Sequence, residues 1–331
     1  MRKRLKILID RHIPLVKGLL DTVADVEYIE PSEFTVDRVH YADALIIRTR
    51  TKCDAALLEG SSVRFIATAT IGYDHIDSVY CRSNGIEWVN APGCNAWSVA
   101  NYIDAAIRFS LPDFKGKTIG VIGVGHVGSK VCKIAEAMGM NVMPCDPPRV
   151  VAGDTLDSDG SLIRFYELSE VASVADIVTF HVPLDATTHH IINAYFLHSC
   201  NPDAIIINAS RGAVLSTADA LRATQKFIID CWEGEPSINR QLLDKALLAT
   251  PHIAGYSLDG KANGTVAVVN AVSNFFDLGV RVSVDLLGLP PKDYSKRYDI
   301  ESESIALKSH PEKFEWFRNN YPIRRDLISN Y

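Results

Sequence analysis

Residues 118–128 read Thr-Ile-Gly-Val-Ile-Gly-Val-Gly-His-Val-Gly, a short apolar run that leads directly into the pattern Gly-x-Gly-x-x-Gly. The run has the length of a buried strand, and a helical pattern follows over Val127–Met138. In such a unit the first glycine permits a tight turn, the second lets a pyrophosphate approach, and the third lets helix and strand pack closely. The residues expected to touch a bound dinucleotide are Gly123, Gly125, His126, Val127 and Gly128.

An acidic residue closes this unit. Asp146 follows the next strand-like run and lies eighteen residues past Gly128. A carboxylate at this place accepts hydrogen bonds from ribose hydroxyls and repels a 2′-phosphate, so the sequence favours NAD over NADP as cofactor. Arg149 puts a cation nearby, so the preference is not absolute. The alternative is a glycine turn in an unrelated α/β protein, and the complete strand–helix–strand–Asp context argues against it.

Apolar runs of strand length alternate with helical patterns along most of the chain. A first series comprises Leu5–Ile9, Ala44–Ile47, Val63–Ala67 and Ile86–Val89. A second series comprises Thr118–Ile122, Asn141–Cys145, Asp176–His181, Ala204–Asn208 and Phe227–Cys231. Continuous apolar strands between helices indicate parallel sheets covered on both faces. The sequence therefore predicts an α/β protein with two doubly wound parallel-sheet domains.

The composition is that of an ordinary globular protein. The 331 residues are 47% hydrophobic, and their formal charge of −6 favours neither a nucleic acid nor an anionic membrane as partner. The apolar run near the N-terminus ends at Asp10, and no stretch approaches the ~18 apolar residues of a membrane span. The seven cysteines form no Cys-x-x-Cys pair, which indicates buried thiols in a reducing cytoplasm and no metal site.

Three polar segments follow strand-like runs of the second series, at 208–213, 230–236 and 251–256. Open α/β sheets bind ligands at such strand ends. Transfer of a hydride from a carbon that bears a hydroxyl group needs a base for the hydroxyl proton and a cation for a neighbouring carboxylate. His252 suits the first role and Arg211 the second, although each alone would more often be structural. Acidic side chains in the middle segment either orient the imidazole or are simple loop charges.

The order of these motifs resembles the D-2-hydroxyacid dehydrogenase family over about residues 6–278. Gly-x-Gly-x-x-Gly with a later Asp is followed by Asn-x-x-Arg-Gly, Asp-x-Trp-Glu-x-Glu-Pro and Pro-His-Ile-Ala-Gly. The resemblance implies a Rossmann NAD-binding domain at residues 96–256 and a flavodoxin-like substrate-binding domain at residues 1–95 and 257–282. Residues 283–331 are expected to form a small C-terminal appendage that makes a homodimer or, alternatively, packs on its own subunit.

The resemblance also implies roles for single residues. Arg211 matches the arginine that holds the substrate carboxylate, His252 the acid/base, and Glu235, rather than Glu233, the carboxylate that pairs with the histidine. The implied cofactor contacts are Thr179, Asp230 and Gly255, and the implied substrate contacts are Thr49, Thr70 and Tyr256. We add Arg48 as a substrate contact, because a phosphorylated substrate needs charge-assisted donors; the alternative is a salt-bridged surface arginine.

The detailed residue sequence of several segments is similar to that of a family member that acts on a phosphorylated hydroxyacid. The segments include Ala91-Pro-Gly-Cys-Asn-Ala96 and Trp232-Glu-Gly-Glu-Pro236. One alternative is another dehydrogenase of the family, such as a phosphoglycerate dehydrogenase or a simple 2-hydroxyacid dehydrogenase. A second is a non-catalytic binding protein that responds to NADH, against which the intact catalytic residues argue.

Two helix-to-strand connections are shorter than the resemblance implies, near residues 107–113 and 221–227. A true deletion would strain a helix next to the catalytic arginine. The other explanation is that loop residues are missing from the numbered chain, and we favour it because disorder concentrates in such connections. We therefore expect a break in the backbone at both places.

Overall fold

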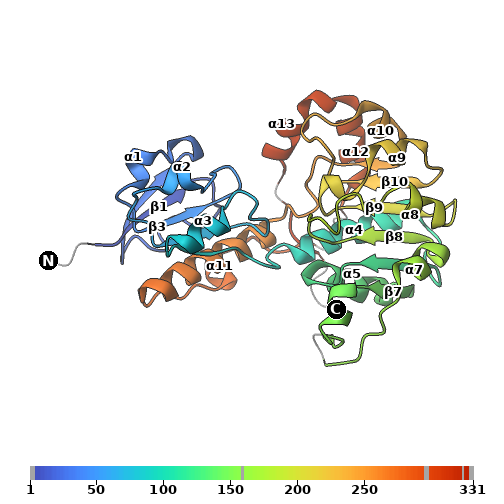
Figure 1. The fold of residues 1–331 in the computed structure, drawn as a ribbon, viewed down its shortest axis with the longest axis horizontal. Coiled ribbons are helices and arrows are strands. Elements are labelled where there is room, and N and C mark those ends of the chain that lie inside the picture. The colour runs from blue at the N-terminus through green and yellow to red at the C-terminus, as the bar shows by residue number, and fades with distance from the viewer. Residues whose placement is uncertain (1–3, 158–159, 294–297, 323, 328–331) are drawn as a thin grey trace. The chain divides into compact units, whose positions relative to one another are not determined.

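The computed structural model describes residues 4–157, 160–293, 298–322 and 324–327 (Figure 1). The chain divides into two compact α/β units. The first unit comprises the chain up to Asn95 together with Ser257–Pro291. The second comprises Ala96–Tyr256 and the described part of the chain from Lys292 onward. The segment 283–331, expected as one appendage, is therefore divided between the two units.

The first unit is built on a five-stranded parallel sheet with the strand order β2-β1-β3-β4-β5. Its strands are β1 (Lys6–Asp10), β2 (Asp25–Ile29), β3 (Ala44–Ile47), β4 (Phe65–Thr68) and β5 (Glu87–Val89). This order is the flavodoxin-like one, so that prediction is confirmed. The apolar pattern missed β2, because the residues of this edge strand are mostly only partly buried.

Successive residues of β1 face opposite sides of this sheet. Ile7 and Ile9 share a core with Val268 and Val272 of the long helix α11 (Leu258–Phe276), which covers one face (Figure 1). Leu8, between them, belongs to the core on the other face. The helices that contribute to that second core are α1 (Val36–Val39), α2 (Ala55–Leu58) and α3 (Ser78–Ser83). Burial on both faces explains why the central strands are continuously apolar.

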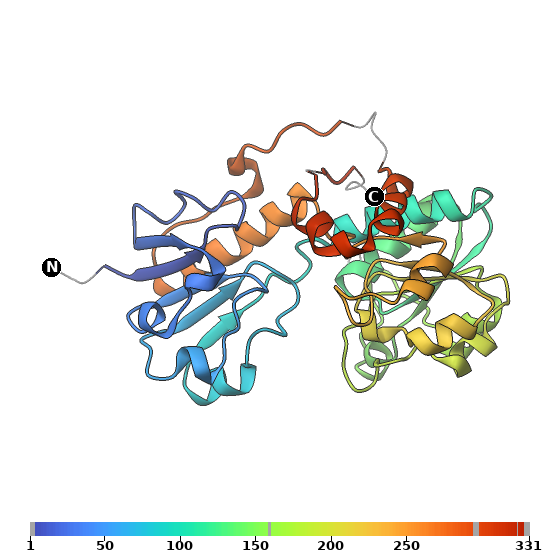
Figure 2. The same cartoon turned by 90° about the horizontal axis from the view of Figure 1, so that it is seen from above.

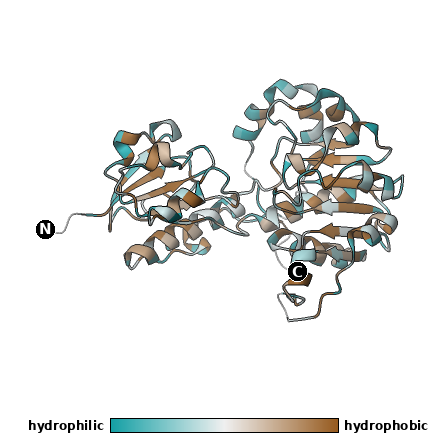
Figure 3. Cartoon of the chain, viewed as in Figure 1, coloured by the Kyte–Doolittle hydropathy of each residue, from teal (hydrophilic) through white to brown (hydrophobic). Residues whose placement is uncertain are grey.

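The second unit carries a six-stranded parallel sheet with the order β11-β10-β9-β8-β6-β7, and its strands are its most hydrophobic segments (Figure 3). The strands are β6 (Thr118–Ile122), β7 (Asn141–Cys145), β8 (Ile177–Phe180), β9 (Ile205–Asn208), β10 (Lys226–Ile229) and β11 (Leu248–Ala249). A Rossmann sheet ordinarily has a further strand outside the second one. Here the described residues between α6 (Pro147–Val151) and α7 (Leu168–Val174) form only an isolated bridge between Leu156 and Leu162.

Helices cover both faces of this sheet, so the predicted doubly wound architecture is confirmed. Ile205 and Ile207 of β9 share a core with α4 (Ala96–Ser110) and α5 (His126–Ala137). Ile206 faces the opposite core, to which α7, α8 (Ala194–Ser199) and α10 (Arg240–Lys245) contribute. Within the described ranges, no helix has the length and apolar character needed to cross a bilayer.

The C-terminal helices α12 (Ile300–Ser309) and α13 (Phe314–Asn319), red in Figure 2, pack on the second unit. Ser304 Oγ accepts a hydrogen bond of 2.9 Å from the backbone N–H of Ala249 in β11. Leu307 and Phe314 are buried in the same core as the sheet. The segment thus covers the outer side of the edge strand β11, where backbone groups do not face β10 and would otherwise lack partners.

The backbone is continuous at both short connections, so the expected breaks are wrong. At the end of α4, the N–H of Leu111 donates to the carbonyl oxygen of Ile107 at 2.9 Å. After α9 (Thr217–Arg222), the buried side-chain amide of Gln225 donates to the carbonyl oxygen of Leu197 at 2.9 Å. Each helix thus reaches the next strand through a short connection.

Replacing Leu307 with alanine tests whether α12 belongs to the core of the second unit. Leu307 is 0% exposed, whereas Ile305 on the same helix is 59% exposed. We expect Leu307→Ala to lower the free energy of unfolding by about 2–5 kcal/mol, because it leaves a cavity. The matched control Ile305→Ala should change it by about 0.5 kcal/mol or less. Urea unfolding followed by circular dichroism measures both, and equal losses would contradict the assignment.

Candidate active site

The glycine-rich loop joins β6 to α5, as the sequence predicts. Gly123 has a φ of +85°, and a Cβ on it would lie 2.7 Å from the carbonyl oxygen of His181. A Cβ on Gly128 would lie 2.0 Å from the carbonyl oxygen of Gly123, so only glycine allows this close packing. A Cβ on Gly125 would meet nothing within 4 Å. This open space at the start of α5, whose first residues are His126 and Val127, fits the pyrophosphate of a dinucleotide.

Asp146 braces the glycine-rich loop from the end of β7. Its Oδ2 accepts a hydrogen bond of 2.7 Å from the N–H of Val124, and its Oδ1 accepts one of 3.2 Å from the N–H of Arg149. The Arg149 guanidinium donates to Val124 O at 2.9 Å and pairs with Asp154 at 2.9 Å. The carboxylate therefore lies where this fold binds a ribose, and the nearby cation is already compensated.

The three candidate catalytic residues follow three neighbouring strands. Arg211 comes after β9, Glu235 after β10 and His252 after β11. Because these strands are parallel and adjacent, their carboxyl ends meet at one edge of the sheet. The side-chain amide of Asn208 ties two of the loops together, since it donates to Arg211 O at 2.9 Å and to Cys231 O at 3.2 Å.

Arg211 presents a guanidinium that no carboxylate of the described residues neutralises. Its Nη1 donates to the carbonyl oxygen of Ser210 at 2.8 Å. The next residue must be glycine, because a Cβ on Gly212 would lie 2.0 Å from the carbonyl oxygen of Trp232. The loop is thus pressed against the segment that carries Glu235, with a half-buried cation available for an anionic ligand.

His252 and Glu235 form a close pair. His252 Nδ1 lies 2.6 Å from Glu235 Oε1, and the side chains are 25% and 24% exposed. Burial raises the pKa of Glu235, but the hydrogen bond from His252, the N–H of Trp232 and the charge of Arg318 outweigh burial and leave this pKa below its ordinary value. His252 has a φ of +56°, a strained conformation for a residue with a side chain. The pair is a carboxylate that orients an imidazole, the arrangement of an acid/base catalyst.

Glu233, the rejected partner, is engaged elsewhere. Its Oε1 lies 2.6 Å from His190 Nε2, and its Oε2 accepts a hydrogen bond of 3.1 Å from the N–H of Thr217. Glu233 therefore braces a neighbouring loop, and the geometry distinguishes the two acids in the way that the sequence pattern suggests.

Asp230 is buried and organises the loop around His252. Its Oδ1 accepts hydrogen bonds from Thr250 Oγ1 at 2.7 Å and from the N–H of Ile253 at 2.8 Å. Its Oδ2 accepts one of 3.0 Å from the N–H of Ala254. Asp230 is expected as a cofactor contact; in the structure its carboxylate binds the Thr250 hydroxyl and the backbone N–H groups that follow His252.

Two further expected cofactor contacts lie near these loops. Thr179, at the end of β8, is fully buried and its Oγ1 lies 3.0 Å from His181 Nε2. Burial lowers the pKa of His181 to about 3, so this imidazole is neutral at physiological pH. Gly255 lies in the turn after His252 and is partly buried.

Residues of the C-terminal segment, which the motifs did not indicate, also reach these loops. Arg318 of α13 donates from Nε to the Tyr256 hydroxyl at 3.1 Å. Arg324 donates to the carbonyl oxygens of Ala254 at 2.8 Å and Tyr256 at 3.0 Å. No spacing in the sequence could have found them, because the contacts arise from docking of a segment that begins about fifty residues later in the chain.

The substrate contacts expected in the first unit lie after its strands. Arg48 follows β3, and its Nε pairs with the fully buried Asp10 at 2.9 Å. Arg48 thus forms a salt bridge, which was the alternative to its expected contact with the substrate. Thr49 is exposed and lines a cavity of about 380 Å³. Thr70 Oγ1 donates to the carbonyl oxygen of Gly72 at 2.8 Å. These residues are not brought together with Arg211 and His252 within one unit.

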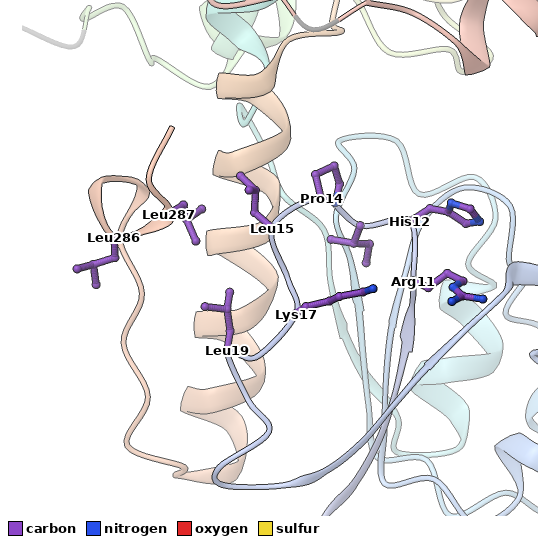
Figure 4. A pocket seen from close by; sticks show the side chains of 9 residues that line it. Arg11, His12, Pro14, Leu15, Lys17, Leu19, Leu286 and Leu287 are labelled. Carbon is purple, nitrogen blue, oxygen red and sulfur yellow. The ribbon is translucent and has the colours of Figure 1, made fainter. Parts of the chain in front are cut away.

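A larger cavity of about 510 Å³ lies elsewhere in the first unit, between the loop after β1 and the short helix η3 (Val284–Leu287) (Figure 4). Figure 4 shows Leu286 and Leu287 on one side of it and Arg11 and His12 on the other. Both basic residues pair with Glu30. The cavity contains none of the expected site residues, so we do not assign it to the reaction. Among the described residues, no cluster of side chains could hold a metal ion.

The chain is similar to known proteins. Residues 93–254 match the family model described as D-isomer specific 2-hydroxyacid dehydrogenase, NAD binding domain. The erythronate-4-phosphate dehydrogenase of Bacteroides fragilis is 44% identical, with 97% of each chain covered. The protein of the same name from Bacteroides thetaiotaomicron is 45% identical, also with 97% of each chain covered.

A solved structure supports the fold. The NAD⁺-bound 3-phosphoglycerate dehydrogenase of Entamoeba histolytica superposes with a TM-score of 0.70 at 24% identity, over 85% of this chain and 99% of that one. The relatives align over nearly the full chain and the family model covers the NAD-binding unit. The chain belongs to the D-2-hydroxyacid dehydrogenase family and, within it, to the group of the erythronate-4-phosphate dehydrogenases.

Proposed function

We propose that the protein oxidises 4-phospho-D-erythronate to 2-oxo-3-hydroxy-4-phosphobutanoate with NAD, a step of pyridoxal 5′-phosphate (vitamin B6) biosynthesis. The observation that carries the proposal is the 2.6 Å contact between His252 Nδ1 and Glu235 Oε1, in the unit that also holds Arg211 and the NAD-binding loop. The names of relatives that cover 97% of the chain support the choice of substrate.

The catalytic residues divide the reaction between them. Because Nδ1 of His252 faces Glu235, Nε2 is left to take the proton of the substrate's C2 hydroxyl group. Glu235 stays ionised, since its pKa is below the ordinary value, and stabilises the imidazolium that forms. Arg211 holds the substrate carboxylate next to C2 and polarises the carbonyl that develops there. When bound, NAD supplies the acceptor for the hydride that leaves C2.

The nucleotide site favours NAD over NADP. The negative charge of Asp146 lies at the end of β7, where it repels a 2′-phosphate. Arg149, the cation that could attract this phosphate, is held by Asp154 and by the carbonyl oxygen of Val124. The charge of Asp146 and the contacts that hold Arg149 thus both disfavour a 2′-phosphate at this site.

Further contacts complete the proposal. Thr179, Asp230 and Gly255 are proposed as cofactor contacts, and Thr49, Thr70 and Tyr256 as substrate contacts. Their support is their position at or after the carboxyl ends of strands in parallel sheets, where ligands of such folds bind. Arg48 is proposed to reach the substrate with Nη1, because its other two guanidinium nitrogens donate to Asp10.

The cysteines support a reducing compartment, and we propose the cytoplasm. All seven are free thiols, and all except Cys94 are buried. Burial raises the pKa of Cys53, Cys132, Cys145 and Cys200 to about 12, which keeps these thiols unreactive.

We propose a homodimer in which the C-terminal segment takes part. The proposal is supported by Trp316 of α13, a large apolar side chain that is 58% exposed in the single chain. Exposed aromatic residues are enriched in protein interfaces.

A panel of substrates tests the reaction. Candidates are 4-phospho-D-erythronate, 3-phospho-D-glycerate and D-lactate, each with NAD or NADP and a 2-oxoacid that reoxidises bound cofactor. We expect turnover of the first with NAD, followed by nicotinamide absorbance and product analysis. Preference for another acid would assign another activity of the family. Tight NADH binding without any turnover would favour a protein that senses NADH.

Separate replacement of Glu235 and Glu233 with glutamine tests the catalytic pair. Glu235→Gln should lower kcat by about 10²- to 10⁴-fold, because the imidazolium loses its counter-charge. The control Glu233→Gln removes the same charge next to His190 and should change kcat little. The assignment fails if the two variants lose activity equally.

A further inference from the structure

The C-terminal segment is fastened to the loop that follows His252. Arg324 Nη2 donates to Ala254 O at 2.8 Å, and its Nε donates to Tyr256 O at 3.0 Å. The same guanidinium lies 4.2 Å from the centre of the Tyr298 ring. Two hydrogen bonds to backbone and a cation–π contact hold α13 and the residues after it at the edge of the candidate active site.

Arg318 extends from this fastened segment to the side chain of Tyr256. Its Nε donates to the Tyr256 hydroxyl at 3.1 Å, and its Nη1 forms a long ion pair of 3.5 Å with Glu315 Oε1. Nη2 forms no hydrogen bond with a described residue. The side chain is 24% exposed, so water or a ligand can reach it. A guanidinium has five N–H donors in a fork, and hydrogen bonds to described residues engage two of those of Arg318.

Arg318 also lies close to the catalytic residues. Its charge is one of the causes that hold the pKa of Glu235 below the ordinary value. Burial raises the pKa of the Cys231 thiol, and the charges of Arg211 and Arg318 both act against that increase. The two cations therefore lie near the same buried thiol, within the unit that carries the His252–Glu235 pair.

A phosphorylated hydroxyacid has two anionic ends and needs a cation for each. Arg211 accounts for the carboxylate beside C2. The buried Asp10 already neutralises the guanidinium of Arg48. Arg48 therefore does not supply the positive charge that the phosphate needs. Arg318 donates to the side chain of an expected substrate residue, Tyr256, whereas Arg324 is held by backbone carbonyl oxygens. The carboxylate partner of Arg318, Glu315, lies 3.5 Å away.

We propose that Arg318, supplied by the C-terminal segment, binds the terminal phosphate of the substrate and makes the site selective for a phosphorylated acid. The inference rests on the proposed function and extends it to the group that selects the substrate. It gives the C-terminal segment a direct part in substrate recognition.

Binding to the NADH complex tests this without turnover, because the hydroxyacid cannot be oxidised there. Calorimetric titrations would compare 4-phospho-D-erythronate with D-erythronate on the NADH-saturated protein. In the unchanged protein the phosphorylated acid should bind more tightly. Arg318→Met should weaken its binding by about 10- to 100-fold while D-erythronate binds as before. Arg318→Lys should lie between, and the control Arg222→Met, at a side chain 80% exposed, should change neither.

The outcomes separate this proposal from the proposed function. Equal weakening of both acids in Arg318→Met would make Arg318 a structural residue and overturn the proposal. No preference for the phosphorylated acid in the unchanged protein, or no loss in Arg318→Met, would also overturn it. Loss of the preference together with an absence of oxidation by the unchanged protein with NAD would support the phosphate site and reject the proposed reaction.

Discussion

The buried carboxylate of Asp230 is the constraint on which the candidate chemistry depends. It accepts hydrogen bonds from the Thr250 hydroxyl and from the N–H groups of Ile253 and Ala254. A buried carboxylate without such donors is costly, so loop and carboxylate stabilise each other. His252 lies within this loop, in a left-handed conformation that it would not adopt by itself. The network holds it there, against Glu235 Oε1.

The parallel sheet brings the partners of this loop together. Arg211, Glu235 and His252 follow neighbouring strands, so the sheet registers their loops at one edge. The C-terminal segment then packs over that edge, where Arg324 binds the backbone beyond His252 and Arg318 contacts Tyr256. The site and the described part of the chain from Lys292 onward thus belong to one compact unit.

Local patterns predicted most of the second unit, because a glycine turn, a following helix and buried strands are determined within a few residues. The distinction between Glu235 and Glu233 followed from family wording, and the hydrogen bonds of each acid agree with it. Longer-range features were not predictable: Arg318 and Tyr256 are 62 residues apart in sequence. The strand β2 escaped the apolar pattern because it is partly exposed. The expected backbone breaks were wrong, because the chain runs without a gap through both short connections.

The position of the proton on the neutral His252 imidazole shows directly whether Glu235 orients this ring through Nδ1. Selective ¹⁵N labelling of histidine, with His252→Asn to assign the signals, gives the tautomer by nuclear magnetic resonance. We expect a proton on Nδ1 in a short hydrogen bond to Glu235 and an unprotonated Nε2, with the downfield proton signal lost in Glu235→Gln. A neutral imidazole protonated on Nε2 would contradict it, because that nitrogen could not then accept the substrate's proton.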